Sequence, residues 1–428
     1  MALELTDADR SALHGELGQG KALAMSLVVK LAEISGATGL VDIVGAHIDG
    51  CLFHGQAGLD YVSRLGEDCE VAVPTTLNVS SLDLLHPDLY RGDADTARSA
   101  RLLMDAHVAL GCRPTWTCAP YQLPDRPALG DQVAWGESNA IVFANSVLGA
   151  RTARYGDFAD LACAITGRAP YSGLHTDAGR RATDIVDLSL LPDAWLDEET
   201  FYPVLGYWIG SKCGTGVPAI IGLESIGLES VDPDSDGADI RAGEDRLKAI
   251  GAAAASSGAT AMFHAVGVTQ EAPDVETVTR GEEVRKHDVQ PADITRIRNR
   301  LGAEAGPIAA VSVGTPHMSL DELQSLADLV SGRRARVPFY ANTARDTVAM
   351  LSEQRLRSLE SFGVTLVTDT CTYITPISGD VEGAVMTNSG KWAYYAPGNL
   401  GVDVVFAGLA ECVDSAENGS AVLGALFT

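Results

Sequence analysis

Residues 306–368 read GPIAAVSVGTPHMSLDELQSLADLVSGRRARVPFYANTARDTVAMLSEQRLRSLESFGVTLVT, and this stretch decides the fold class. Its three apolar runs, at 306–314, 336–340 and 364–368, have the length and composition of buried strands. The segments between them have the spacing of helices. Strands that alternate with helices predict a parallel sheet with right-handed crossovers, so the sequence indicates the α/β class.

Two residue pairs mark helix starts inside this stretch. Ser319 with Glu322, and Thr343 with Asp346, have the spacing in which a hydroxyl caps the first turn of a helix. We therefore expect one helix after each of the first two strands.

Residues that carry chemistry follow each of the three strands. Residues 315–317 (Thr-Pro-His) come after the first strand, Asn342 after the second, and residues 369–371 (Asp-Thr-Cys) after the third. Because a parallel sheet binds its ligands at the carboxyl ends of its strands, a thiol, an imidazole and a carboxylate are predicted to converge there.

The N-terminal part is predicted to begin with two helices, the first capped by Thr6 with Asp9. Leucines at 23, 27 and 31 and Ile34 form the expected buried stripe of the second helix. Strand-like runs at 40–45 and 69–74 precede polar loops, and a helix is expected over about 96–110. Residues 113–127 contain four prolines, which predict an ordered loop without regular helix.

The third quarter of the chain carries less information. The acidic segment 232–245 is predicted to be an exposed excursion, and 251–269 a small-residue helix that runs into a strand. We expect two regions: 1–230, with loops around Cys51 and Cys118, and 231–428, an α/β region with Cys371.

Charge and cysteine usage exclude several classes of function. The 57 acidic residues outnumber 31 basic ones, and the net charge of −26 disfavours nucleic acid and anionic membrane as partners. The first 15 residues lack the basic and apolar segments of a secretory signal. The eight cysteines lie far apart, as expected of thiols in a reducing compartment, so a cytoplasmic protein is predicted.

Common catalytic fingerprints are missing from the sequence. It contains no G-x-G-x-x-G after a strand, no P-loop, no H-E-x-x-H and no G-x-S-x-G. The glycines of 210–216 (GSKCGTG) lack the P-loop order and are interpreted as a turn. Nucleotide binding, zinc proteolysis and serine hydrolysis therefore lose their main support.

Several polar clusters remain, and together they resemble one family, aconitase X. The likeness runs through the whole chain in order, which makes it more specific than any one motif. The blocks that carry it are GAHIDGCLFHGQAGLDY (45–61), VPTTLNVSSLDLLHPDLY (73–90), RPTWTCAPY (113–121), WGESNAIVFANSVLGART (135–152), VGTPHMSLDEL (313–323), TDTCTYITP (368–376) and NSGKWAYYAPG (388–398).

The resemblance implies an aconitase-like catalytic core of several domains with parallel βαβ sheets, lacking the family's small swivel domain. It also implies iron, held by cysteine thiolates, that acts as a Lewis acid on a substrate hydroxyl. Cys118 and Cys371 are the expected ligands, with Cys51 as the third. The iron is expected as a [2Fe-2S] or [4Fe-4S] cluster, or as a mononuclear ion completed by histidine or aspartate.

Other roles follow from the same blocks. Without the resemblance, the polar residues of these blocks also fit helix caps and solvated helix ends. By resemblance, the expected catalytic residues are Glu137, Ser138, His47 and Lys391, and the expected substrate-binding residues are Asn139, Asn145, Ser146, Arg151, Thr75, Thr76, His317 and Ser389.

The resemblance implies a hydro-lyase of a small hydroxy acid, working with a separate swivel-domain subunit. The expected reaction dehydrates cis-3-hydroxy-L-proline to 1-pyrroline-2-carboxylate, because no basic cluster or glycine nest for phosphate is visible. Mevalonate 5-phosphate dehydratase is the alternative. A non-catalytic metal-binding or redox-sensing paralogue is a second alternative.

Overall fold

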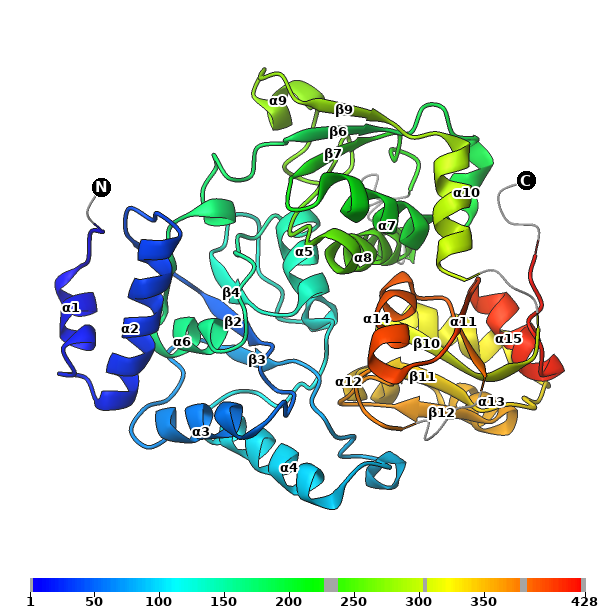
Figure 1. Cartoon of the computed structure of the whole chain (residues 1–428), viewed down its shortest axis with the longest axis horizontal. Coiled ribbons are helices and arrows are strands. Elements are labelled where there is room, and N and C mark those ends of the chain that lie inside the picture. Colours follow the sequence, from blue (N-terminus) through cyan, green and yellow to red (C-terminus); the bar gives the residue numbers. More distant parts are fainter. Residues whose placement is uncertain (1–2, 227–237, 303–305, 378–382, 425–428) are drawn as a thin grey trace. The chain divides into compact units, whose positions relative to one another are not determined.

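The computed structural model describes residues 3–226, 238–302, 306–377 and 383–424 (Figure 1). Two compact units emerge from the chain contacts. The first comprises residues 1–83 and 92–181, and the second comprises 84–91 and 182–428. The expected boundary between residues 230 and 231 lies outside the described residues.

The first unit is built on a small parallel sheet in the order β3-β2-β4. A second pair, β1 with β5, is antiparallel. The strands are β1 (Leu40–Asp42), β2 (Gly45–Ile48), β3 (Thr75–Leu77), β4 (Val133–Trp135) and β5 (Arg168–Pro170). The helices are α1 (Asp7–Leu13), α2 (Gln19–Ile34), α3 (Gln56–Leu65), α4 (Ala94–Ala109), α5 (Ser138–Ser146) and α6 (Ala159–Thr166).

Two predictions of where strands and loops lie in this unit were wrong. The run 69–74 is not a strand: the N–H groups of Val71 and Ala72 donate to the carbonyls of Leu110 and Ala164, and the ladder begins only at β3. His47 likewise lies inside β2 rather than in a loop after it. The polar residues of these segments therefore belong to the sheet itself.

The face of α2 was also predicted wrongly, whereas the cap of α1 by Thr6 is confirmed. Ile34 is 85% exposed, and α2 buries Ala24, Met25 and Val28 instead. Small residues on this face let α2 pack closely on α6. The predicted helix at 96–110 is confirmed as α4, and 113–127 is irregular apart from one short 3-10 turn, η2 (Pro120–Gln122).

The second unit contains a four-stranded parallel sheet in the order β8-β7-β6-β9. Helix α8 starts at 238, so the latter part of the predicted excursion 232–245 is helical, and 232–237 lie outside the described residues. Helices α7 and α8 pack side by side (Figure 1). The elements are β6 (Asp184–Asp187), α7 (Phe201–Cys213), β7 (Pro218–Ile221), α8 (Ala238–Gly258), β8 (His264–Ala265), α9 (Val275–Thr279), β9 (Arg285–Asp288) and α10 (Pro291–Arg300).

The same unit contains the predicted α/β sheet of the last third. It has five parallel strands in the order β12-β11-β10-β13-β14. The strand order reverses between β10 and β13, which is where doubly wound sheets open a ligand crevice. The elements are β10 (Ile308–Met318), α11 (Leu320–Leu329), β11 (Phe339–Thr343), α12 (Arg345–Ala349), α13 (Glu353–Phe362), β12 (Val364–Val367), β13 (Ala384–Thr387), α14 (Gly390–Leu400), β14 (Val404–Phe406) and α15 (Leu409–Asn418).

One of the two predicted caps in this sheet is confirmed. Ser319 and Glu322 form the capping box of α11. Thr343 does not cap α12, because it is the last residue of β11 and its hydroxyl donates to the carbonyl of Met318 at 2.9 Å. Because the strand ladder and this hydrogen bond hold Thr343, its hydroxyl does not cap the helix.

None of the helices in the described part of the chain is both long enough and apolar enough to cross a membrane.

Candidate functional site

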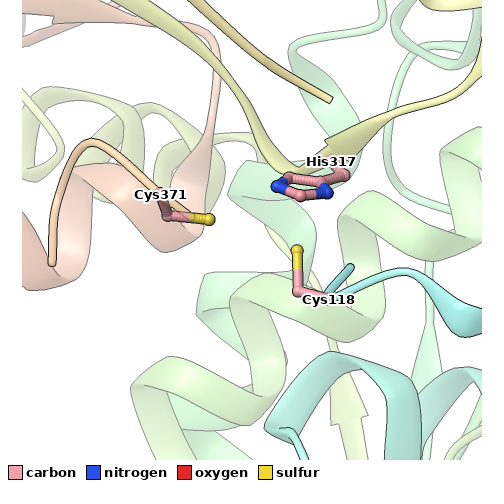
Figure 2. Close-up of side chains that lie close together, drawn as sticks. All are labelled: Cys118, His317 and Cys371. Carbon is pink, nitrogen blue, oxygen red and sulfur yellow. The ribbon is translucent and has the colours of Figure 1, made fainter. Parts of the chain in front are cut away.

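A thiol and an imidazole meet at the carboxyl edge of the five-stranded sheet. His317 is the penultimate residue of β10, and Cys371 follows β12; both are buried. A ring nitrogen of His317 and the Cys371 sulfur lie within 4.8 Å of each other. Figure 2 shows the sulfur turned toward the ring. The predicted convergence of these two groups is confirmed.

Hydrogen bonding sets the tautomer of His317. Its Nε2 lies 3.1 Å from the carbonyl oxygen of Thr370, which can only accept, so Nε2 carries the proton. The lone pair is then on Nδ1, as in histidines that ligate metals and donate their second nitrogen to a carbonyl. The ring therefore has the tautomer of a histidine that can ligate a metal through Nδ1.

A buried polar network holds the loop that carries Cys371. The Asn342 side chain accepts from the Thr372 N–H at 3.0 Å and donates to the Val313 carbonyl at 2.7 Å. The Thr372 hydroxyl lies 2.6 Å from that of Ser312 and accepts from the Trp392 indole at 3.2 Å. Strands β10 and β11 and helix α14 are thus tied to the segment that follows β12, which fixes the thiol position.

The carboxylate predicted at this edge has a different role. Asp369 is fully buried and has a left-handed backbone with φ 59°. It accepts two hydrogen bonds from Arg345, at 2.8 and 2.5 Å, and a third from the Leu84 N–H at 3.1 Å. We interpret Asp369 as an anchor for the strained turn rather than as a metal ligand.

A cavity of about 80 Å³ lies at the reversal of strand order between β10 and β13. Lys391 and Ser389, at the N-terminus of α14, line it together with Thr315. The Thr315 hydroxyl is buried and has no hydrogen-bond partner among the described residues, whereas the Thr315 carbonyl accepts from the Ser389 hydroxyl. A lysine, a hydroxyl and a helix N-terminus together favour a carboxylate ligand.

In the first unit, Cys118 lies on the irregular segment 113–127 and is buried. The carbonyl of Cys118 accepts from the Asn139 side chain at 3.0 Å, and the Tyr121 hydroxyl donates to the Asn139 oxygen at 2.6 Å. The start of α5 therefore holds the cysteine loop in place.

Glu137 sits at the turn between β4 and α5 with φ 65°, a left-handed conformation that is uncommon for a residue with a side chain. Its carboxylate accepts from the N–H groups of Asn139 and Ala140 at 2.9 and 3.0 Å, and from the side chains of Asn139 and Ser138. Strain of this kind tends to occur at functional sites. Glu137, Ser138 and Asn139 are thus brought together with the Cys118 loop.

His47 and the threonines form a separate group on the β2-β3 ladder. The Nδ1 atom of His47 lies 2.8 Å from the Thr76 hydroxyl, and the Thr75 hydroxyl donates to the Val73 carbonyl at 2.8 Å. Burial lowers the pKa of His47 to about 3, so the ring is neutral at pH 7.

Cys51 has surroundings unlike those of a thiolate. Its sulfur donates to the Ile48 carbonyl at 3.3 Å and is fully buried. Burial, followed by the charges of Cys112 and Asp160, raises the pKa of Cys51. Its assignment as the third iron ligand stays a prediction.

Asn145, Ser146 and Arg151 lie at or after the end of α5. The Asn145 side chain bonds both backbone groups of Thr152, at 2.9 and 3.0 Å, and accepts from Arg180 at 2.9 Å. Arg151 pairs with Asp177 at 2.5 Å. Ser146 is buried at the end of α5. These contacts stabilise a reversal of the chain after α5. A substrate-binding role for the three residues stays a prediction.

Several residues that shape the site carry no sequence signal. Tyr121 positions Asn139, and Arg180 holds Asn145 from 35 residues away. Asp160 accepts from the N–H of Asp49 at 2.7 Å. Single buried polar residues without a motif are not distinguishable from surface residues before the fold is known.

Comparisons with known proteins agree with this architecture. Three family models match: the aconitase X first domain over residues 2–178, the second over 182–299 and the third over 308–418. The described residues show no additional swivel domain. The solved structure of Thermococcus kodakaraensis aconitase X in its holo form superposes with a TM-score of 0.82 at 30% identity, over 96% of this chain and 100% of that one.

Curated relatives fall into two named groups. Cis-3-hydroxy-L-proline dehydratases of Hypocrea jecorina and Pseudomonas aeruginosa are 38% and 40% identical, over 98% and 97% of this chain and 69% and 70% of their own lengths. The phosphomevalonate dehydratase large subunit of Methanosarcina mazei is 32% identical over 97% of both chains.

Proposed function

Because the chain belongs to the aconitase X family, we propose that it dehydrates cis-3-hydroxy-L-proline to 1-pyrroline-2-carboxylate. The proton on C2 goes to a base, the C3–O bond breaks and water leaves; the resulting enamine tautomerises to the imine. The observation that carries the proposal is the pair of His317 and Cys371 at the carboxyl edge of the sheet. A thiolate and an imidazole suit iron.

We propose Cys118, His317 and Cys371 as protein ligands of that iron: Cys118 and Cys371 because their blocks resemble those of the family, and His317 because its imidazole lies beside Cys371. Two thiolates and one imidazole fit a mononuclear ion, or a cluster in which histidine replaces a cysteine. Iron bound there supplies a Lewis acid that weakens the C–O bond of the substrate hydroxyl. The buried network around Asn342 and Thr372 holds the loop that carries Cys371, and the Thr370 carbonyl holds the His317 ring.

Charge around the cavity at the strand reversal supports hydroxyproline over a phosphorylated substrate. Glu199, Asp245 and Glu322 line it beside Lys248 and Lys391. The Lys248 ammonium pairs with Asp245 at 2.7 Å and with Glu322 at 2.5 Å, so these carboxylates offset its charge. A phosphate dianion would be repelled by the net negative charge. In a zwitterionic amino acid, the carboxylate can pair with a lysine and the ammonium with an acidic side chain.

The remaining roles are proposed for residues that the first unit holds in strained or buried positions. We propose Glu137 as the group that moves the C2 proton, because its carboxylate is buried and preoriented by four donors. Lys391, with Ser389 and Thr315, is proposed to hold the substrate carboxylate.

We further propose that a small swivel-domain subunit completes the enzyme. The two hydroxyproline dehydratases extend beyond the part that this chain matches, while the similar archaeal proteins are named large subunits. The archaeal large subunit of Methanosarcina mazei matches this chain over 97% of its own length, which supports a second subunit in the complete enzyme.

The test is a side-by-side assay of the iron-loaded chain, with and without the swivel subunit, on cis-3-hydroxy-L-proline and mevalonate 5-phosphate. We expect loss of water from the hydroxyproline only, detected by mass spectrometry, and only with the subunit present. Turnover of mevalonate 5-phosphate alone would move the substrate assignment to the second candidate. No turnover of either substrate by the loaded complex would favour a non-catalytic metal-binding or redox-sensing protein.

A further inference from the structure

A second group of metal-ligating side chains lies away from the site described above, in the four-stranded sheet. Asp184 is the first residue of β6, His287 is the third residue of β9 and Cys213 is the last residue of α7. One carboxylate oxygen, one ring nitrogen and the sulfur all lie within 4.8 Å of one another. The segment 210–216, interpreted from the sequence as a turn, is helical up to Cys213, and only the residues after this cysteine form the turn.

We propose that Asp184, Cys213 and His287 bind a thiophilic divalent cation such as zinc. Cys, His and Asp are the side chains that zinc selects, and water can fill the fourth position. One thiolate and one carboxylate neutralise the two positive charges of the ion, and the thiol releases its proton to solvent on binding.

The distances are close to those of an occupied site. The Nε2 atom of His287 lies 2.8 Å from the Oδ1 atom of Asp184. Two ligands at zinc bond lengths in a tetrahedron are roughly 3.3 Å apart, so the pair must open by only about half an ångström. The sulfur lies within 4.8 Å of the other two ligand atoms, so it must approach them by at most about 1 Å, which rotation about its own side-chain bond can supply.

The second carboxylate oxygen of Asp184, Oδ2, is held by two hydrogen-bond donors of the protein. Asp184 Oδ2 accepts from the Thr183 hydroxyl at 2.7 Å and from Arg285 at 2.8 Å, whereas Oδ1 contacts His287. Such outer contacts orient the ligands of protein metal sites.

Space for this arrangement depends on a glycine. A Cβ atom at Gly216 would stand 2.7 Å from the Thr183 hydroxyl and 2.8 Å from Asp184 Oδ2. The turn after Cys213 can therefore pass over the carboxylate only without a side chain. Asp184 itself is fully buried while the His287 side chain is 24% exposed, so an ion can enter from solvent on the histidine side.

Cobalt titration tests the proposal, because thiolate ligation gives Co²⁺ an intense near-ultraviolet charge-transfer band. The titration uses the full chain with Cys118→Ser and Cys371→Ser, stripped of metal with a chelator. These two substitutions remove the proposed cysteine ligands of iron, so that they do not contribute to the measurement. We expect one equivalent of cobalt to bind with this band. Zinc should displace the cobalt.

Variants in this background assign the ligands. Cys213→Ser should abolish the band, His287→Gln should weaken binding by at least about tenfold, and Arg285→Ala by about tenfold through the loosened carboxylate. Cys412→Ser, at a buried thiol of the same unit, and Lys286→Ala, at an exposed neighbour on β9, should change neither the cobalt band nor the affinity for cobalt.

Two outcomes would overturn the site. The first is cobalt binding with an unchanged band in Cys213→Ser, and the second is an unchanged affinity in His287→Gln. Because His287 is partly exposed, His287→Gln should keep the melting temperature of the metal-free protein, so it remains informative if Cys213→Ser fails to fold.

Discussion

At the scale of single residues, Glu137 combines a strained backbone with a buried carboxylate. We expect Glu137→Gln to lower kcat/KM by at least about 100-fold, since general base catalysis contributes on that order. Its effect on stability should be limited to about 1 kcal/mol from the weakened cap of α5. Steady-state kinetics and thermal melting separate these two effects.

Asp93 provides the matched control for that variant, because it also caps a helix but is exposed at the start of α4. Asp93→Asn should lower only the melting temperature. If Glu137→Gln behaves in the same way, with kcat/KM retained, Glu137 is a cap and not the base.

Two thiols of the second unit allow a test of iron binding residue by residue. Cys371 lies beside an imidazole, whereas Cys412 is packed among apolar side chains such as Leu323 and Leu326. Cys371→Ser should lose most of the bound iron per chain, as measured by metal analysis. Cys412→Ser should keep the iron and instead lose about 1 to 3 kcal/mol of stability, because a hydroxyl is placed in an apolar core.

At the scale of elements, helices α7 and α8 depend on glycine contacts. A Cβ atom on Gly206 would overlap the backbone of Ile250, and one on Gly210 would overlap that of Ala254. Gly206→Ala should therefore force the helices apart and lower the free energy of unfolding by about 3 kcal/mol, as judged by denaturant titration.

Substitution of an exposed helical glycine should have the opposite effect on the free energy of unfolding. Gly398 lies in α14 with open space where its Cβ atom would be. Gly398→Ala should raise the free energy of unfolding by about 0.5 to 1 kcal/mol, because alanine loses less backbone entropy. Equal effects of the two substitutions would contradict the close packing of α7 on α8.

The elements also show what the sequence allows one to predict. The strands β10, β11 and β12 begin with or consist mainly of apolar residues, so their parallel arrangement and the convergence of His317 and Cys371 could be predicted from the pattern. The position of Thr343 and the buried face of α2 do not, because tertiary hydrogen bonds and close packing on α6 override local signals. Asp184 and His287, 103 residues apart, become neighbours only through sheet register.

At the scale of the molecule, the first unit contains buried groups whose titration opposes folding in acid. Burial is the largest cause that lowers the pKa of His47 to about 3, and of His107 and His175 to about 4. Below pH 6.5 the unfolded chain takes up protons that the folded unit does not, so stability falls as the pH falls. Each histidine accounts for roughly 3 kcal/mol by pH 4.

Asp160 acts in the opposite direction. Burial raises its pKa to about 8, so between pH 8 and about 4 the folded unit holds a proton that the unfolded chain has released. Stability therefore rises as the pH falls from 8 toward 7, where this aspartate is the larger contribution, and below 6.5 the three histidines outweigh it. These shifts together place the maximum stability of the first unit near pH 6.5.

Hydrogen exchange of the intact chain, corrected for intrinsic exchange rates, measures this maximum in peptides from residues 3–181. Asp160→Asn should remove the decline between pH 6.5 and 8, because the amide is neutral at every pH, while the acid decline persists. Peptides from the second unit serve as the internal reference. A decline above pH 6.5 that survives in Asp160→Asn would assign it to another group, and protection that stays constant from pH 6.5 to 4 would show that the buried histidines are not neutral in the folded unit.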